Sequence, residues 1–199
     1  MIGVAAAAAS KEAILVAGIA GVVAGALSMA AGEYVSVSSQ RDAEEADITR
    51  EKQELATDPK GELEELAAIY RKRGLDPDLA MKVAEQLSAG GRLAVHMRDE
   101  LGLEDGTLAR PFQAAVVSAG SFAGVALLPV LALLAAPASM RIVAIAMVSL
   151  VSLGVLGGIG GRLGGAPMGR AALRVMLGGG AAMVATALIG KLLGVAGIG

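Results

Sequence analysis

Hydrophobic and polar residues are separated into long blocks along this chain. Charged side chains are absent from residues 13–31, 114–136 and 142–159, and a fourth apolar run covers residues 171–189. A helix needs roughly 20 mainly apolar residues to cross the hydrocarbon core of a bilayer. The pattern therefore predicts four membrane-spanning helices.

The block from Gln40 to Arg110 instead has the pattern of polar helices. Its acidic residues at 44, 47, 51 and 54 recur at steps of three and four, which aligns them along one face of a helix. Asp58-Pro59 and Asp76-Pro77 each read as a helix N-cap followed by a proline in the first turn. We predict helices over residues 59–73, 77–89 and 93–101.

The first residues form a short apolar segment. Residues 1–9 would extend over roughly 14 Å as a helix, about half of the hydrocarbon core. A signal peptide would have a basic residue before its apolar run, and none is present here. We therefore interpret residues 1–9 as the second half of a first span. Ser10 is expected to cap the next helix. The expected order is a partial first span (1–9), a second span (13–40), a soluble insert (41–110) and three more spans (111–136, 141–161 and 170–195).

Charge is segregated in the same way. Of the 199 residues, 55 % are hydrophobic, and the mean hydropathy is +0.65. Residues 41–110 hold 11 Lys and Arg against 17 Asp and Glu, a net charge of −6, whereas the remaining 6 basic and 2 acidic residues give +4. The acidic insert excludes nucleic-acid binding, and the lack of cysteine excludes thiolate metal sites. Arginines 162, 170 and 174 mark a cytoplasmic loop, and counting spans back places the insert on the same side.

Carboxylates are arranged symmetrically about Asp58. If the two flanking helices pack antiparallel, Glu54 meets Glu62 and Glu51 meets Glu65, and a cation would relieve the repulsion. Met81 and Glu85, one turn apart on a later helix, could add a thioether and a carboxylate, a ligand set that suits Fe²⁺ or Mn²⁺ better than Ca²⁺. The alternative is a solvated acidic face paired with nearby basic residues.

Three further residues are of types that can bind a metal ion. His96 is interpreted as a surface residue or one with satisfied hydrogen bonds, because no second His or Cys accompanies it. Met29 alone is typical of packing or lipid contact. Glu33 lies at the end of a span, where a carboxylate is costly and indicates an ion pathway, unless it pairs at the interface with Arg41.

These residues resemble the vacuolar iron transporter family. The resemblance is carried by GALSMAAGEYVSVSSQRD (25–42), by the two Glu-x-x-Glu pairs, and by LEELAAIYRKRGLDPDLAMKVAEQL (63–87). It implies an all-α, five-span membrane fold, with the first span partial here, and an inserted cytoplasmic three-helix metal-binding domain. It also implies a homodimer that exports Fe²⁺ from the cytoplasm in exchange for protons, rather than an enzyme. Mn²⁺, Zn²⁺ and Co²⁺ are further candidate ions.

The family's residues map onto this sequence by motif. The resemblance implies metal capture by Glu51, Glu54, Glu62, Glu65, Met81 and Glu85, and a translocation path through Met29 and Glu33. The family's first-span Asp, in a DGLVS-like motif, would precede Met1. The leading expectation is a transporter in a prokaryotic plasma membrane, and two alternatives to it stand beside it. One is a membrane-anchored metal buffer without transport, and the other is a helix bundle whose acidic insert recruits basic partners.

Overall fold

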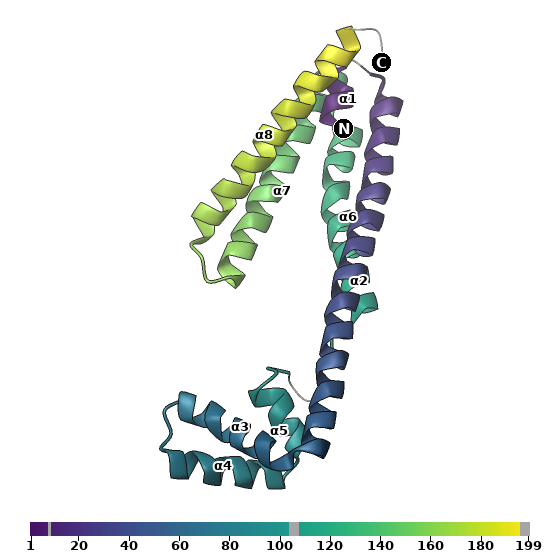
Figure 1. Cartoon of the computed structure of the whole chain (residues 1–199). Helices are drawn as coiled ribbons and strands as arrows, with labels where there is room; N and C mark the ends of the chain where they lie inside the picture. The colour runs from purple at the N-terminus through teal and green to yellow at the C-terminus, as the bar shows by residue number, and fades with distance from the viewer. Residues whose placement is uncertain (8, 104–107, 196–199) are drawn as a thin grey trace. The chain divides into compact units, whose positions relative to one another are not determined.

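The fold was analysed in a computed structural model, which describes residues 1–7, 9–103 and 108–195. These residues divide into two compact units, Met1–Ala31 with Val116–Gly199, and Gly32–Ala115. We call the first the membrane unit and the second the acidic unit. Every regular element in the described residues is helical (Figure 1). In chain order the elements are α1 (Ile2–Ala6), α2 (Lys11–Thr57), α3 (Pro59–Lys72), α4 (Pro77–Ala89), α5 (Arg92–Asp99), α6 (Pro111–Ala135), η1 (Ala138–Met140), α7 (Arg141–Leu163) and α8 (Met168–Val195).

Four helices are long and apolar enough to cross a membrane. They are α2, α6, η1–α7 and α8, with mean hydropathies of 2.2, 2.1, 2.5 and 1.7 over their most apolar windows. The predicted cap is present, since the Ser10 hydroxyl accepts a bond from the amide of Ala13 at 3.2 Å. As expected, α2 continues without a break from its apolar beginning into the acidic stripe.

The membrane unit is held together by close approaches at glycines. A Cβ on Gly157 of α7 would lie 2.9 Å from the side chain of Val175 on α8, and a Cβ on Gly190 of α8 would overlap the backbone of Gly3 in α1. Small residues allow helices to approach in this way where lipid supplies no hydrophobic driving force. The predicted contact face of α2 is used in part, because Gly25 accommodates the ring of Phe122 whereas Gly21 faces open space.

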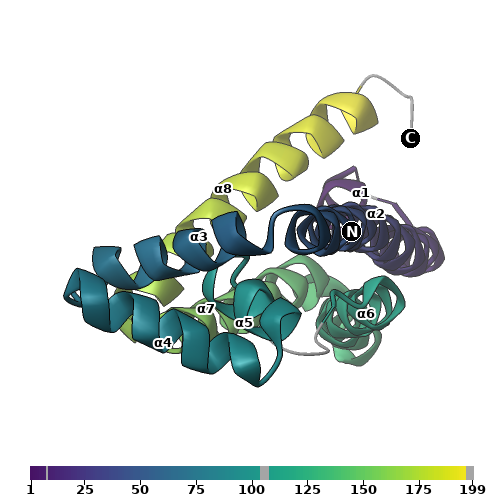
Figure 2. The same cartoon turned by 60° about the horizontal axis from the view of Figure 1, so that its bottom comes forward.

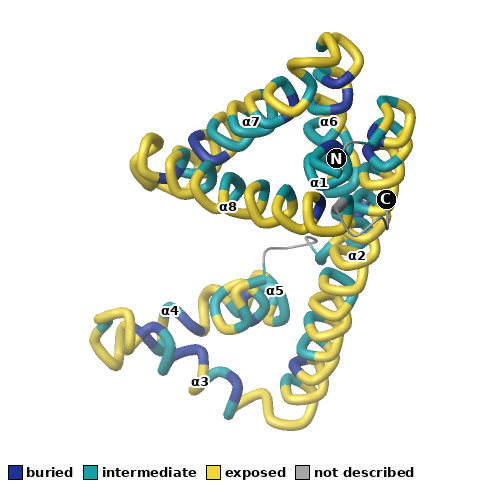
Figure 3. The backbone as a smooth tube through the Cα atoms, turned by 90° about the horizontal axis from the view of Figure 1, so that it is seen from above, coloured by how far each residue is buried: buried dark blue, intermediate teal, exposed yellow. Residues whose placement is uncertain are grey.

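The acidic unit has a small apolar core between α3, α4 and α5. Asp58 caps α3 by accepting from the amide of Gly61 at 2.9 Å, and Asp76 caps α4 by accepting from the amide of Asp78 at 3.0 Å. Both helices therefore begin at the predicted prolines. Figure 3 shows buried residues along α3 and α4. The core consists of Leu66, Ala67, Tyr70, Ala80, Ala84 and Val95.

The hairpin geometry expected around Asp58 is wrong. From the end of α2, α3 runs away at a wide angle instead of folding back along it, as Figures 1 and 2 show from two directions. Since α3 packs against α4 and α5, its apolar face is already occupied. The carboxylates on either side of the turn therefore meet in a different pairing.

Candidate metal site

Two buried glutamates come from the two sides of the α2–α3 turn. Glu51 lies in the last two turns of α2 and is 2 % exposed, and Glu62 lies in the first turn of α3 and is 8 % exposed. Asp58 fixes the turn between them, and a Cβ on Gly61 would run into its carboxylate. The turn therefore directs both glutamates toward the same interior point.

The third member comes from α5, and the fourth is the residue that caps the C-terminal end of this helix. His96, 1 % exposed, and Glu100 are four residues apart, so they share one face of the helix. The Nδ1 atom of His96 lies 2.9 Å from Oε1 of Glu51, 3.0 Å from Oε2 of Glu100 and 3.6 Å from Oε2 of Glu62. One ligand atom from each of these four residues falls within 4.8 Å of the others. We call Glu51, Glu62, His96 and Glu100 the carboxylate–imidazole group.

Burial makes this group electrostatically costly when it is ionised. Burial, followed by the charge of Glu100, raises the pKa of Glu51 to about 7 from its ordinary value of 4.5. Burial is also the main cause of the raised pKa of Glu62, and the neighbouring charge of Glu65 adds to it. Among the described residues, no Lys or Arg forms an ion pair with Glu51, Glu62 or Glu100.

More carboxylate oxygens face His96 than its Nδ1 atom can serve as a hydrogen-bond donor. An imidazole Nδ1 carries at most one proton, and the geometry of its hydrogen bond favours Glu100. Glu51 Oε1 is at hydrogen-bond distance but forms no hydrogen bond of acceptable geometry in the described part of the chain. A buried, unpartnered carboxylate oxygen is unfavourable unless a cation or proton compensates it. Three carboxylates and one imidazole nitrogen make a donor set that suits Fe²⁺, Mn²⁺, Co²⁺ or Zn²⁺.

A second polar network fixes the position of α5. Asp99, next to Glu100, accepts bonds from the Tyr70 hydroxyl at 2.6 Å and from Arg73 at 2.9 Å, both on the α3 side. The adjacent guanidinium of Arg98 at 2.7 Å, together with Tyr70 and Arg73, holds the pKa of Asp99 well below its usual range. The ionised Asp99 thereby holds the end of α5 that carries His96 and Glu100 against α3.

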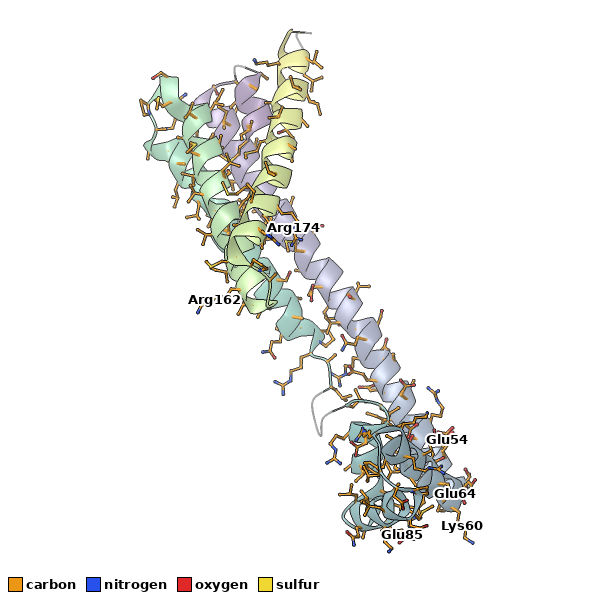
Figure 4. The ribbon with its side chains drawn as sticks, turned by 90° about the vertical axis from the view of Figure 1, so that its left-hand side faces the viewer. Glu54, Lys60, Glu64, Glu85, Arg162 and Arg174 are labelled. Atoms are coloured by element: carbon orange, nitrogen blue, oxygen red, sulfur yellow. The ribbon has the colours of Figure 1, made fainter. Side chains whose placement is uncertain are left out.

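The remaining predicted ligands lie outside this group. Glu54 and Glu65 are exposed, and Glu85 is an exposed residue at the edge of a cavity of about 210 Å³ that is also lined by Glu62 and His96 (Figure 4 labels Glu54 and Glu85). Met81 is partly buried against the apolar core of the acidic unit. The structure thus places two of the six predicted ligands, Glu51 and Glu62, close together, beside His96 and Glu100 rather than beside Met81 and Glu85.

His96 is not on the surface, which was one of the two alternatives expected for it. It is buried and hydrogen-bonded to Glu100, in agreement with the other alternative, and its neighbours are carboxylates rather than a second His or Cys. The signal that could have identified its partner is the i, i+4 spacing of His96 and Glu100 at the end of one short helix, which places two candidate ligands on the same face.

The two residues predicted for a translocation path both lie on α2. Met29 is 44 % exposed, and Glu33, one turn further along the helix, is also exposed. Among residues 1–7, 9–103 and 108–195, neither side chain takes part in a hydrogen bond or an ion pair.

Apolar helices of spanning length together with a buried carboxylate–imidazole group define a helical membrane protein with a candidate cation site. The sequence profile of the VIT family matches residues 1–191. The chain belongs to the VIT family.

Several curated proteins are similar to this chain. A vacuolar iron transporter of Acanthamoeba castellanii is 49 % identical over 122 residues, which cover 61 % of this chain and 47 % of that protein. A vacuolar iron transporter of Centaurea cyanus is 37 % identical over 65 % of this chain and 54 % of its own length. A vacuolar iron transporter homolog of Oryza sativa subsp. japonica is 35 % identical over the whole chain and 68 % of its own length. The chain spans about half the length of the first two relatives.

Proposed function

We propose that this protein binds Fe²⁺ at the carboxylate–imidazole group and moves it across the membrane, out of the cytoplasm. The observation that carries the proposal is the buried oxygen of Glu51, which forms no hydrogen bond with any described residue and lies among two further carboxylates and a histidine. Such a group is stabilised by a cation. Family membership and the names of the similar proteins support iron as that cation, and Mn²⁺, Zn²⁺ and Co²⁺ fit the same donors.

Protons are proposed as the counter-ion. Carboxylates bind either a metal or protons, so metal binding releases protons and depends on pH. Glu51, with a pKa of about 7, changes protonation near neutral pH. The acidic unit would therefore release protons when Fe²⁺ enters and take them up when it leaves.

The membrane arrangement is part of the same proposal. With α1 as a partial span packed on α8, the membrane unit has five membrane segments, and the acidic unit is inserted between the second and third, on the cytoplasmic side. We place the protein in a prokaryotic plasma membrane as a homodimer, with Met29 and Glu33 along the path. Glu54, Glu65, Met81 and Glu85 remain predicted ligands that lie outside the group.

Fe²⁺ flux into proteoliposomes that contain the full chain tests this function. Flux is expected for the wild-type protein, and it should be lost in Glu51→Gln and in Glu33→Gln. Glu64→Gln, a change of an exposed carboxylate on α3 outside the group, is the matched control and should keep full activity (Figure 4).

Two outcomes would contradict the proposal in different ways. Tight Fe²⁺ binding that depends on Glu51, without flux, would favour the membrane-anchored metal buffer. Absence of Fe²⁺ binding by the wild-type chain would remove the metal hypothesis altogether.

A further inference from the structure

One end of the membrane unit carries a concentration of positive charge without acidic side chains. Arg162 lies in the last turn of α7, and Arg170 and Arg174 lie in the first two turns of α8 (Figure 4 labels Arg162 and Arg174). All three are exposed. The only acidic side chain in the membrane unit is Glu12. It is remote from these arginines, because it neighbours Arg141 at the opposite end of α7.

The position of these arginines is unfavourable for the helix that carries two of them. The N-terminal end of a helix has a partial positive charge and favours anions. Arg170 and Arg174 are also separated by four residues, so they lie on one face, where like charges repel. An anion bound at the start of α8 would offset both effects.

A groove runs from this end into the apolar part of the unit. It has a volume of about 520 Å³, lies between α7 and α8, and is lined by Arg174 together with Leu153, Leu156 and glycines of α7. From Gly164 to Leu153 the backbone rises by roughly 16 Å, close to half of a 30 Å hydrocarbon core. Gly157 and Gly161 let α8 approach closely, whereas a Cβ on Gly160 would meet nothing within 4 Å and so leaves open space in the groove.

We propose that this groove binds an anionic phospholipid of the bilayer, with the phosphate on the arginines and one acyl chain along the glycines of α7. Basic pockets between transmembrane helices bind anionic lipid headgroups in this way. A second copy of the chain fits the face less well. A symmetric contact through the same surface would bring six arginines together with no acidic side chain of either membrane unit to neutralise them.

Lipid binding is measured on the purified full chain in detergent, by native mass spectrometry with added phosphatidylglycerol or phosphatidylcholine. One retained phosphatidylglycerol per chain is expected, in preference to phosphatidylcholine. The double variant Arg170→Gln, Arg174→Gln should weaken phosphatidylglycerol binding about 30-fold, because each arginine near an anionic surface contributes about 1 kcal/mol. The single variant Arg174→Gln should weaken binding about 5-fold, by the contribution of one arginine. Its matched control is Lys191→Gln, which removes one positive charge near the other end of α8 and should leave binding unchanged.

A glycine variant tests the acyl part of the groove separately. A Cβ on Gly160 meets nothing within 4 Å, so Gly160→Leu should fill the groove without disturbing the helix pair and should reduce lipid retention. Gly178→Leu, at an equally open position on α8 outside the groove, should retain lipid.

Three results would overturn the proposal. One is equal retention of the two lipids by the wild-type chain. Another is weaker binding in the arginine variant together with unchanged lipid retention in Gly160→Leu, because this combination would indicate a general attraction between the arginines and anionic lipid. The third concerns the melting temperature of the full chain in detergent. If inorganic phosphate alone raises it as much as phosphatidylglycerol does, the acyl chain contributes nothing to binding. Fe²⁺ binding by the acidic unit, measured on the same preparations, reports independently on the proposed transport function.

Discussion

Replacing Glu51 with glutamine should change stability and metal binding in opposite directions. The folded protein holds the pKa of Glu51 at about 7, against 4.5 for an ordinary glutamate. Between these values the folded state binds more protons than the unfolded state, so stability falls as pH rises through this window. At pH 8 the ionised side chain costs at most about 3 kcal/mol, because one pKa unit corresponds to 1.36 kcal/mol. At pH 5 the cost is small.

Glutamine is uncharged at every pH and removes this cost. Without metal, Glu51→Gln should therefore stabilise the acidic unit at pH 8, by up to about 3 kcal/mol, and change little at pH 5. Native-state hydrogen exchange of the full chain measures this. After correction for intrinsic exchange rates, amides of α3 and α5 should exchange up to about 100-fold more slowly in the variant at pH 8. With Fe²⁺ present the order should reverse, because the wild type gains binding energy that the variant lacks.

Glu64→Gln is the control for this experiment, since Glu64 is exposed and lies outside the group. If Glu51→Gln exchanges faster than wild type at pH 8 without metal, ionised Glu51 must be compensated within the protein itself. If Fe²⁺ protects the variant and the wild type equally, Glu51 is not a ligand. Either result would refute the reasoning from burial.

Three further substitutions test contacts within the acidic unit and within the membrane unit. Asp99→Asn should destabilise α5 by about 1–3 kcal/mol, because it weakens the charge-assisted bonds from Arg73 and Arg98, and it should lower Fe²⁺ affinity in calorimetry. Glu44→Ala removes the acceptor of the Ala109 amide at 2.9 Å and should cost about 1 kcal/mol, seen as faster exchange at that amide. Gly157→Ala should destabilise the α7–α8 pair by about 1–3 kcal/mol in thermal unfolding. Its control is Gly160→Ala at an open position.

The helices could be predicted because their signals are local. Apolar runs of spanning length, and an Asp-Pro cap before α3 and before α4, are readable without knowledge of any contact. The capping bonds of Asp58 and Asp76 involve residues at most three positions away. Tertiary packing did not need to be known for these elements.

The metal site could be predicted only in part because its geometry depends on tertiary packing. Symmetry about Asp58 pairs Glu51 with Glu65, but this pairing holds only if α2 and α3 lie antiparallel. The apolar face of α3 packs on α4 and α5 instead, which brings Glu62 toward Glu51. His96 enters through a contact with Glu62 across 34 positions of sequence, which no local pattern specifies. Two of the six ligands predicted from the sequence, Glu51 and Glu62, are therefore members of the candidate site, and its other two members, His96 and Glu100, were not among them.

Glutamates that are equivalent by their spacing in the sequence differ in burial, and the effect of burial on Fe²⁺ binding can be measured. Glu54 and Glu65 are exposed, so each should act on an approaching cation through a solvent-screened charge worth roughly 0.2–1 kcal/mol. The variants Glu54→Gln and Glu65→Gln should therefore weaken Fe²⁺ binding by a few-fold at low salt and hardly at all at 0.5 M salt, since screening is then strong. Glu62→Gln, which removes a buried oxygen donor, should weaken it by at least about 100-fold at both salt concentrations, because even groups that merely support a ligand cost 10- to 100-fold. Isothermal titration of the four proteins at two salt concentrations compares these effects. An equally large, salt-independent loss in Glu54→Gln would show that Glu54 binds the ion directly and that the ligand shell extends beyond the buried group.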